Sequence, residues 1–83
     1  MTKPKKPTGI PPFVGANIRD LRLKKTLSLK KLHKQGGPTP STMSAIENGK
    51  SGFDVGTLIQ IARALGVLPS KLLPDDLFEA LTW

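Results

Sequence analysis

The chain has 83 residues, with 13 Lys and Arg against 6 Asp and Glu, and its formal net charge is +7. This length suits one domain with a thin core. There is no cysteine and only one histidine, which excludes disulfides and leaves too few ligands for a metal, so we expect no cofactor. Catalytic groups are scarce, and no apolar run approaches the about 20 residues of a membrane span. We therefore expect a cytoplasmic protein that is not an enzyme.

The excess of positive charge indicates what kind of molecule the protein could bind. A field of this sign attracts polyanions, and strongly basic domains commonly bind nucleic acid. Lysines that only keep a small protein soluble give the same composition. Charge alone therefore leaves both interpretations open.

Residues 1–12 are predicted to form a disordered basic arm, which precedes a helical domain at 13–74. The arm holds four prolines and three lysines and few apolar residues. Proline removes a backbone donor and disfavours helix at the residue before it. Such an arm could follow a phosphate backbone or lie in a minor groove, or it could be a solvated tail.

The first helix is predicted from about residue 13 or 14 to residue 25. Val14, Ile18 and Leu21 recur at the spacing of one helical face, which forms an apolar stripe. Lys24 and Lys25 lie in the last turn, where positive charge interacts favourably with the helix dipole.

Two helices joined by a short glycine-containing turn are predicted next. Ser28 is an N-cap residue for a short helix that ends at the glycines of positions 36–37. The following helix is predicted over Thr39–Glu47, because Thr39 can cap it and Pro40 occupies the first position, where a missing N–H costs nothing.

A fourth helix is predicted after Asp54, and Gly66 ends it. A fifth, short helix is predicted near Pro69–Leu73, and residues 75–83 could add a further turn. The expected fold is therefore all-α, with five helices and a short extra C-terminal helical turn. The apolar face of the fourth helix consists of Val55, Leu58, Ile61, Ala62 and Leu65.

The second and third predicted helices have the design of a helix-turn-helix unit. A helix can enter the major groove, about 12 Å wide, when its exposed face is slim and can form hydrogen bonds. In such a unit the first helix crosses the phosphates and the second presents its N-terminal residues to the bases. Ser28 and Thr39 lie at helix N-termini, where N–H groups and the dipole favour phosphate.

The segments LSLKKL (27–32), STMSAIENGK (41–50) and TLIQIARALGV (57–67) occur in one register, with Gly37 and the leucines at 72–73. Together they resemble the lambda-repressor-like family, which includes Cro and regulators of the xenobiotic-response-element type. The resemblance covers about residues 14–73 and implies a compact five-helix fold.

The resemblance also implies roles for single residues. Arg22 and Glu47 match a structural ion pair between the first and third helices. Asn48 and Lys50 match positions that hold the DNA backbone, and Thr42 could reach a phosphate or a base. The base-facing positions are Pro40, Ser41, Ser44 and Ala45.

Several of these residues depart from the family pattern. Pro40 and Ala45 can offer only apolar contacts, and serine discriminates bases poorly. Specificity is therefore expected to depend on DNA shape, the arm or the spacing of half-sites in a dimer. His33 is expected to be partly buried, in the space that Gly36 leaves.

The leading hypothesis is a sequence-specific regulator that binds double-stranded DNA through the major groove as a homodimer. A repressor or autoregulator of phage, plasmid or restriction-modification-control type fits so compact a chain. The alternative is an antitoxin or adaptor that also represses its own operon and binds a protein partner through its C-terminus. The residues expected to contact a second copy or a partner, or to cover the chain's own core, are Leu77, Phe78, Leu81 and Trp83.

Overall fold

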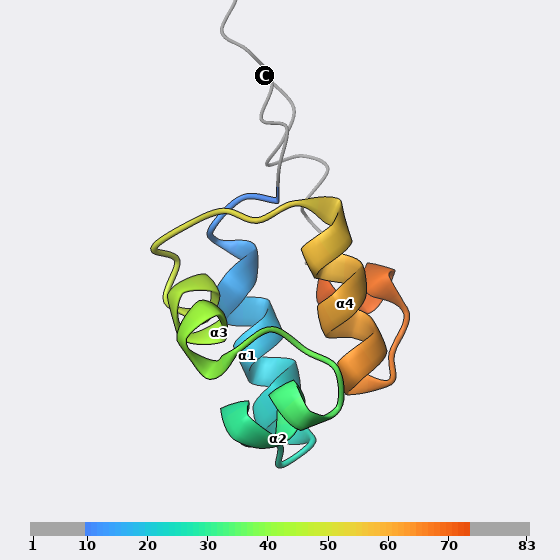
Figure 1. Cartoon of the computed structure of the whole chain (residues 1–83). Coiled ribbons are helices and arrows are strands. Elements are labelled where there is room, and N and C mark those ends of the chain that lie inside the picture. The colour runs from blue at the N-terminus through green and yellow to red at the C-terminus, as the bar shows by residue number, and fades with distance from the viewer. Residues whose placement is uncertain (1–9, 74–83) are drawn as a thin grey trace, which may run out of the picture.

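The helices of the chain are arranged around one core and are joined by short turns. The computed structural model describes residues 10–73, and no strand lies among them. In this part of the chain there are four α-helices and one 3₁₀ helix (Figure 1). They are α1 (Val14–Lys24), α2 (Leu29–Lys34), α3 (Pro40–Glu47), α4 (Val55–Leu65) and η1 (Pro69–Leu72).

Three of the helices begin at the N-cap residues that the sequence predicts. The hydroxyls of Ser28 and Thr39 accept hydrogen bonds from the N–H three residues further on, at 3.0 and 3.3 Å. The Asp54 carboxylate accepts from the N–H of Thr57 at 2.7 Å. This hydrogen bond lowers the pKa of Asp54, so the cap stabilises α4 at neutral pH and weakens as the carboxylate is protonated in acid.

Each α-helix is followed by a residue with positive φ, and the next N–H bonds back to the carbonyl five positions earlier at 3.0–3.2 Å. This is the Schellman arrangement. After α2, α3 and α4 the left-handed residue is a glycine, but after α1 it is Thr26, with φ 54°. A side chain in this conformation costs about 1–2 kcal/mol, so the turn between α1 and α2 is strained.

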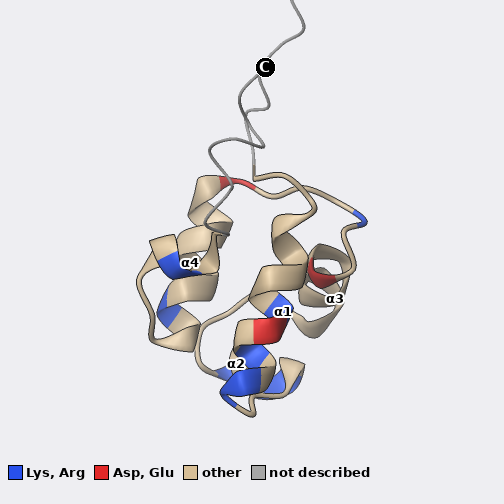
Figure 2. Ribbon diagram, turned by 180° about the vertical axis from the view of Figure 1, so that it is seen from behind, with Lys and Arg blue, Asp and Glu red and all other residues tan. Residues whose placement is uncertain are grey.

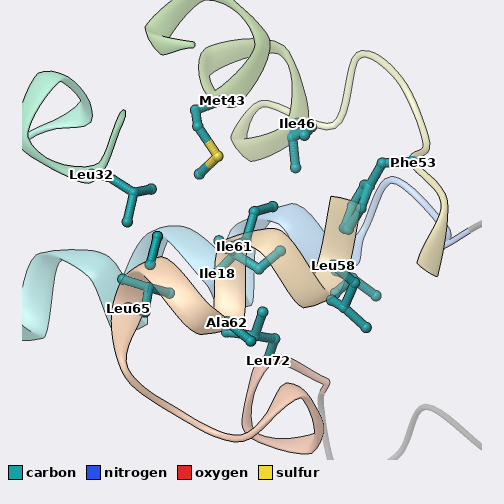
Figure 3. Close-up of a cluster of buried hydrophobic side chains, with 12 residues drawn as sticks. Ile18, Leu32, Met43, Ile46, Phe53, Leu58, Ile61, Ala62, Leu65 and Leu72 are labelled. Carbon is teal, nitrogen blue, oxygen red and sulfur yellow. The ribbon is translucent and has the colours of Figure 1, made fainter. Parts of the chain in front are cut away.

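The core lies between α1, α3, α4 and η1, and α2 closes one end. Ile18 of α1 and Ile61 of α4 lie at its centre, with Ile46 on the α3 side and Leu72 on the η1 side (Figure 3). The other apolar side chains buried in it are Val14, Leu32, Met43, Phe53, Leu58, Ala62, Ala64 and Leu65.

The prediction of five α-helices is wrong in its last element, because residues 69–72 form a 3₁₀ helix. The N–H of Lys71 donates to the carbonyl three residues earlier, at 2.9 Å. Four residues that begin with Pro69 are too few for α-helical bonding. Asn17 of α1 donates to the Leu72 carbonyl at 2.6 Å and holds the end of η1. The extra turn expected within 75–83 lies outside the described residues.

We expected residues 10–12 to belong to the N-terminal arm, but they lie against the loop that precedes α4. Ile10 and Phe53 exchange backbone hydrogen bonds as an isolated antiparallel bridge. Ile10 is half-buried and packs on the core. The folded part of the chain therefore begins before α1.

Gly15 lets α1 and α3 approach each other backbone to backbone. It is buried, and a Cβ placed on it would lie 1.8 Å from the carbonyl oxygen of Ile46 and 2.7 Å from its carbonyl carbon. No side chain can be accommodated there without separating the helices. Glycine at this position therefore sets the distance between α1 and α3.

We expect Gly15→Ala to destabilise the protein by about 3 kcal/mol, the upper range for overpacking, because the new methyl group meets backbone atoms that cannot rotate away. The matched control is Gly56→Ala in the first turn of α4. A Cβ there would have only an ordinary contact, 3.5 Å from Asp54, and helix propensity favours alanine. Denaturant unfolding of both variants measures the difference, and equal stability of the two would contradict this account of the α1–α3 contact.

Candidate nucleic-acid interface

The unit formed by α2, residues 35–39 and α3 is the candidate interface with nucleic acid. The two helices pack against each other, and α2 also packs on α4. Gly37 and Pro38 of the connecting turn are buried. Gln60 of α4 donates to the Gly36 carbonyl at 3.1 Å, which fastens the turn to the body of the domain.

The third helix presents a narrow polar surface. Its apolar side chains Met43 and Ile46 are buried in the core. Apart from the buried Glu47, its remaining side chains are small, so the helix can approach the floor of a groove closely. Ser41, Thr42, Asn48 and the following Lys50 are exposed, as are the cap residues Ser28 and Thr39, whereas Pro40, Ser44 and Ala45 are half-buried.

Some of the polar groups on this surface are already bonded to one another. Thr39 donates to the Thr42 hydroxyl at 3.0 Å, and Asn48 donates to the Ser44 hydroxyl at 3.3 Å. Within residues 10–73 the Ser41 side chain has no such bond. A hydroxyl can donate and accept at the same time, so each of these groups keeps some capacity for DNA.

A buried ion pair joins α1 to α3 behind this surface. Nε of Arg22 lies 2.7 Å from one carboxylate oxygen of Glu47, and Nη2 lies 2.9 Å from the other. The residues are only 7 % and 8 % exposed. The hydrogen bonds to Glu47 raise the pKa of Arg22. Two hydrogen bonds of this kind fix the relative orientation of the two side chains as well as the distance between them.

Arg22 also makes a contact that the sequence did not indicate. Its Nη1 donates to the carbonyl of Leu27 at 2.6 Å, immediately before α2 begins. One guanidinium therefore connects α1, the start of α2 and the end of α3. The burial of both side chains supports a structural role for Arg22 and Glu47.

The structure places His33 differently from our expectation. The residue is exposed, and its Nδ1 donates to the carbonyl of the buried Gly37 at 2.9 Å. The ring therefore lies on the surface and stabilises the end of α2 through its hydrogen bond to the Gly37 carbonyl. The space near Gly36 is open, since a Cβ there would meet nothing within 4 Å.

Sequence reasoning missed two residues that position the interface. Gln60 bonds to a backbone carbonyl 24 positions away, and no residue pattern encodes such a partner. Gly15 did have a signal, because a glycine inside a helical pattern often marks close packing.

Two negative findings limit the chemistry of the described residues. Within 10–73 no group of three His, Asp or Glu side chains is placed to hold a metal ion. No helix in this range has the length and apolarity to cross a membrane.

The fold and the exposed polar α3 define a helix-turn-helix protein. Residues 15–74 match the family model of the helix-turn-helix domain, and the chain belongs to this family. No curated protein sequence matches the chain.

Solved structures of other regulators share the fold. The restriction-modification controller protein C.AhdI from Aeromonas hydrophila has a TM-score of 0.68 and 28 % identity, over 72 % of this chain and 91 % of its own. The clp gene regulator ClgR from C. glutamicum has a TM-score of 0.66 and 27 % identity, over 81 % and 82 %. The hypothetical transcription factor NHTF from Neisseria has a TM-score of 0.69 and 25 % identity, over 99 % and 98 %.

These findings confirm the resemblance to regulators of the lambda-repressor and Cro type. The chain is a DNA-binding transcription regulator of the helix-turn-helix class. Its family and fold are those of DNA-binding transcription regulators.

A double-mutant cycle measures how strongly Arg22 and Glu47 are coupled. We expect Arg22→Met or Glu47→Leu alone to cost about 3–5 kcal/mol of unfolding free energy, since either leaves an uncompensated buried charge. The double variant should cost clearly less than the sum, because both charges are gone. Urea unfolding of the four proteins gives the coupling, and a coupling of zero would remove the structural role assigned to the pair.

Proposed function

We propose that the protein binds an operator through the major groove as a homodimer and acts as a repressor or autoregulator in the cytoplasm. The observation that carries the proposal is the slim polar face of α3, held by the buried ion pair of Arg22 and Glu47. The likeness to C.AhdI, a restriction-modification controller, supports a regulator of similar type.

In the proposed complex, α3 enters the groove with its N-terminal end foremost. Ser41 and Ser44 face base edges, while Pro40 and Ala45 offer apolar surface to a thymine methyl group. Ser28, Thr39, Thr42, Asn48 and Lys50 are assigned to the phosphates beside the groove.

This set of side chains can form few hydrogen bonds that discriminate between bases. Bidentate contacts, which give the strongest discrimination, need Arg, Lys, Asn or Gln on the bases. Serine at two positions supplies weaker contacts. The proposed regulator therefore takes part of its specificity from DNA shape and from half-site spacing.

Selection of bound duplexes from a random library tests the proposal, because such a library contains every candidate operator. We expect enrichment of an inverted repeat with half-sites about 34 Å apart, one helical turn. Ser41→Ala with Ser44→Ala should then weaken binding to that site roughly 30-fold, since each hydrogen bond contributes about 1 kcal/mol. The matched control is Ser70→Ala in η1, which should bind as the parent does. A library that yields no preferred sequence would contradict the proposal.

The proposed dimer depends on residues 77–83, which lie outside the described residues. Leu77, Phe78, Leu81 and Trp83 are assigned to contact with the second copy, because a small basic domain gains from added apolar cover. We expect deletion of 77–83 to abolish the dimer in sedimentation and operator binding together. If the truncated chain remains dimeric and binds DNA as before, the segment does not form the dimer. This result would favour contact with a partner protein, as in the antitoxin or adaptor alternative.

A further inference from the structure

Residues 10–12 run along the loop that joins α3 to α4, at the end of the molecule opposite α2 (Figure 1). We call residues 10–12 the strap and residues 49–53 the α3–α4 loop. The N–H and the carbonyl of Ile10 are both bonded to the backbone of Phe53, the carbonyl at 3.2 Å. The next two carbonyls of the strap accept from N–H groups at the start of α1, at 3.1 and 3.0 Å. The strap therefore connects the α3–α4 loop to α1.

Gly52 lets the strap lie close to the α3–α4 loop. A Cβ placed on Gly52 would lie 2.8 Å from the carbonyl oxygen of Ile10. Gly49 of the same loop has a positive φ, but Gly52 does not. The backbone conformation at position 52 therefore does not require glycine, whereas the nearby carbonyl oxygen of the strap does.

The strap provides the hydrogen bonds of the second half of the loop. The N–H of Lys50 donates to the carbonyl of Ala45 at 3.0 Å, so the end of α3 holds the first half. In the described part of the chain, the hydrogen bonds of residues 51–53 are the two with Ile10. The other attachment of this half is the side chain of Phe53, which is buried in the core. The position of the loop therefore depends on the strap as well as on the core.

The α3–α4 loop carries one positively charged residue, Lys50, just beyond α3. Figure 2 shows it as the basic residue of the loop that leads away from α3. Its side chain is exposed, and the proposed function assigns it to a phosphate. A lysine on a moving loop must be ordered when it binds, and this ordering lowers affinity. A loop that is already fixed in the free protein avoids part of that loss.

From these contacts we infer that the strap positions Lys50 for the DNA backbone. Ile10 and Gly52 are then positioning residues, which act on binding through the loop and need no contact of their own with DNA. The inference rests on the proposed function, in which Lys50 meets a phosphate.

A strap with a structural role alone would behave differently. Ile10 is half-buried and packs on the core, so loss of the strap lowers stability in either case. A structural strap would leave the affinity of the folded protein for DNA unchanged. A positioning strap changes that affinity, and the change passes through Lys50.

Two variants release the strap by different routes. Gly52→Ala places a methyl group against the Ile10 carbonyl oxygen, and Ile10→Pro removes the N–H that donates to Phe53. Gly56→Ala is the matched control, because its methyl group has an ordinary contact at 3.5 Å. We expect the Phe53 amide to exchange faster with solvent in both strap variants and at the parent rate in the control. Circular dichroism checks that each protein is folded at the temperature of the binding measurement.

Affinity is measured on a duplex of random sequence, well below the melting temperature of every protein compared. We expect both strap variants to bind about 2- to 10-fold more weakly than the parent, the fold-change that corresponds to ordering one long side chain on binding. The Gly56→Ala control should bind as the parent does.

Combination with Lys50→Gln shows whether the strap acts through this lysine. In the parent, Lys50→Gln should weaken binding and lower the slope of log affinity against log salt by about 0.9. In the strap variants the same change should cost less affinity, because the loop no longer holds Lys50 in place. Lys71→Gln in η1 is the control and should have the same effect in every background.

Equal costs of Lys50→Gln in the parent and in both strap variants, or strap variants that bind as the parent does, would overturn the inference. Because the duplex has a random sequence, these measurements do not depend on an operator. Selection of an operator from the library together with such a result would contradict the role of the strap alone. Unequal costs without any selected sequence would contradict the proposed function alone.

Discussion

The buried contact of Arg22 with Glu47 is the interaction on which the arrangement of the other helices depends. A charged pair is expensive to remove from water, and it is tolerated when every polar atom finds a partner. Here no buried side-chain nitrogen or oxygen of the described residues lacks one. Because Arg22 also reaches the Leu27 carbonyl, the angle between α2 and α3 is set from α1, a helix outside the helix-turn-helix unit.

Much of this fold follows from local chemistry, and those parts could be predicted from the sequence. The caps at Ser28, Thr39 and Asp54 and the glycine at 66 act within one turn of the residue concerned, so composition and spacing reveal them. The last element could not be assigned in this way. Besides the short length of residues 69–72, their conformation depends on packing against α1, which lies far away in the sequence.

The candidate interface, like the fold, has some features that the sequence reveals and others that it does not. The resemblance assigned Pro40, Ser41, Ser44 and Ala45 to the face toward DNA, and the structure leaves Ser41 exposed and the other three half-buried. Contacts were hidden where the partner is a backbone atom, as for Gln60 with the Gly36 carbonyl in the turn before α3 and for Ile10 with Phe53 in the loop before α4. Side chains carry sequence patterns and carbonyl groups do not, so such contacts become visible only in three dimensions.

Thr26 has a consequence for the dynamics of the domain. Local opening of a turn requires less free energy when the closed form is strained. Three of the four Schellman turns use glycine and avoid this strain, so the turn after α1 should open first and its amides should exchange fastest with solvent. That turn contains the carbonyl of Leu27, so its opening frees one of the hydrogen bonds of Arg22. Of the four turns that follow the α-helices, the one that joins α1 to α2 is therefore expected to be the least stable.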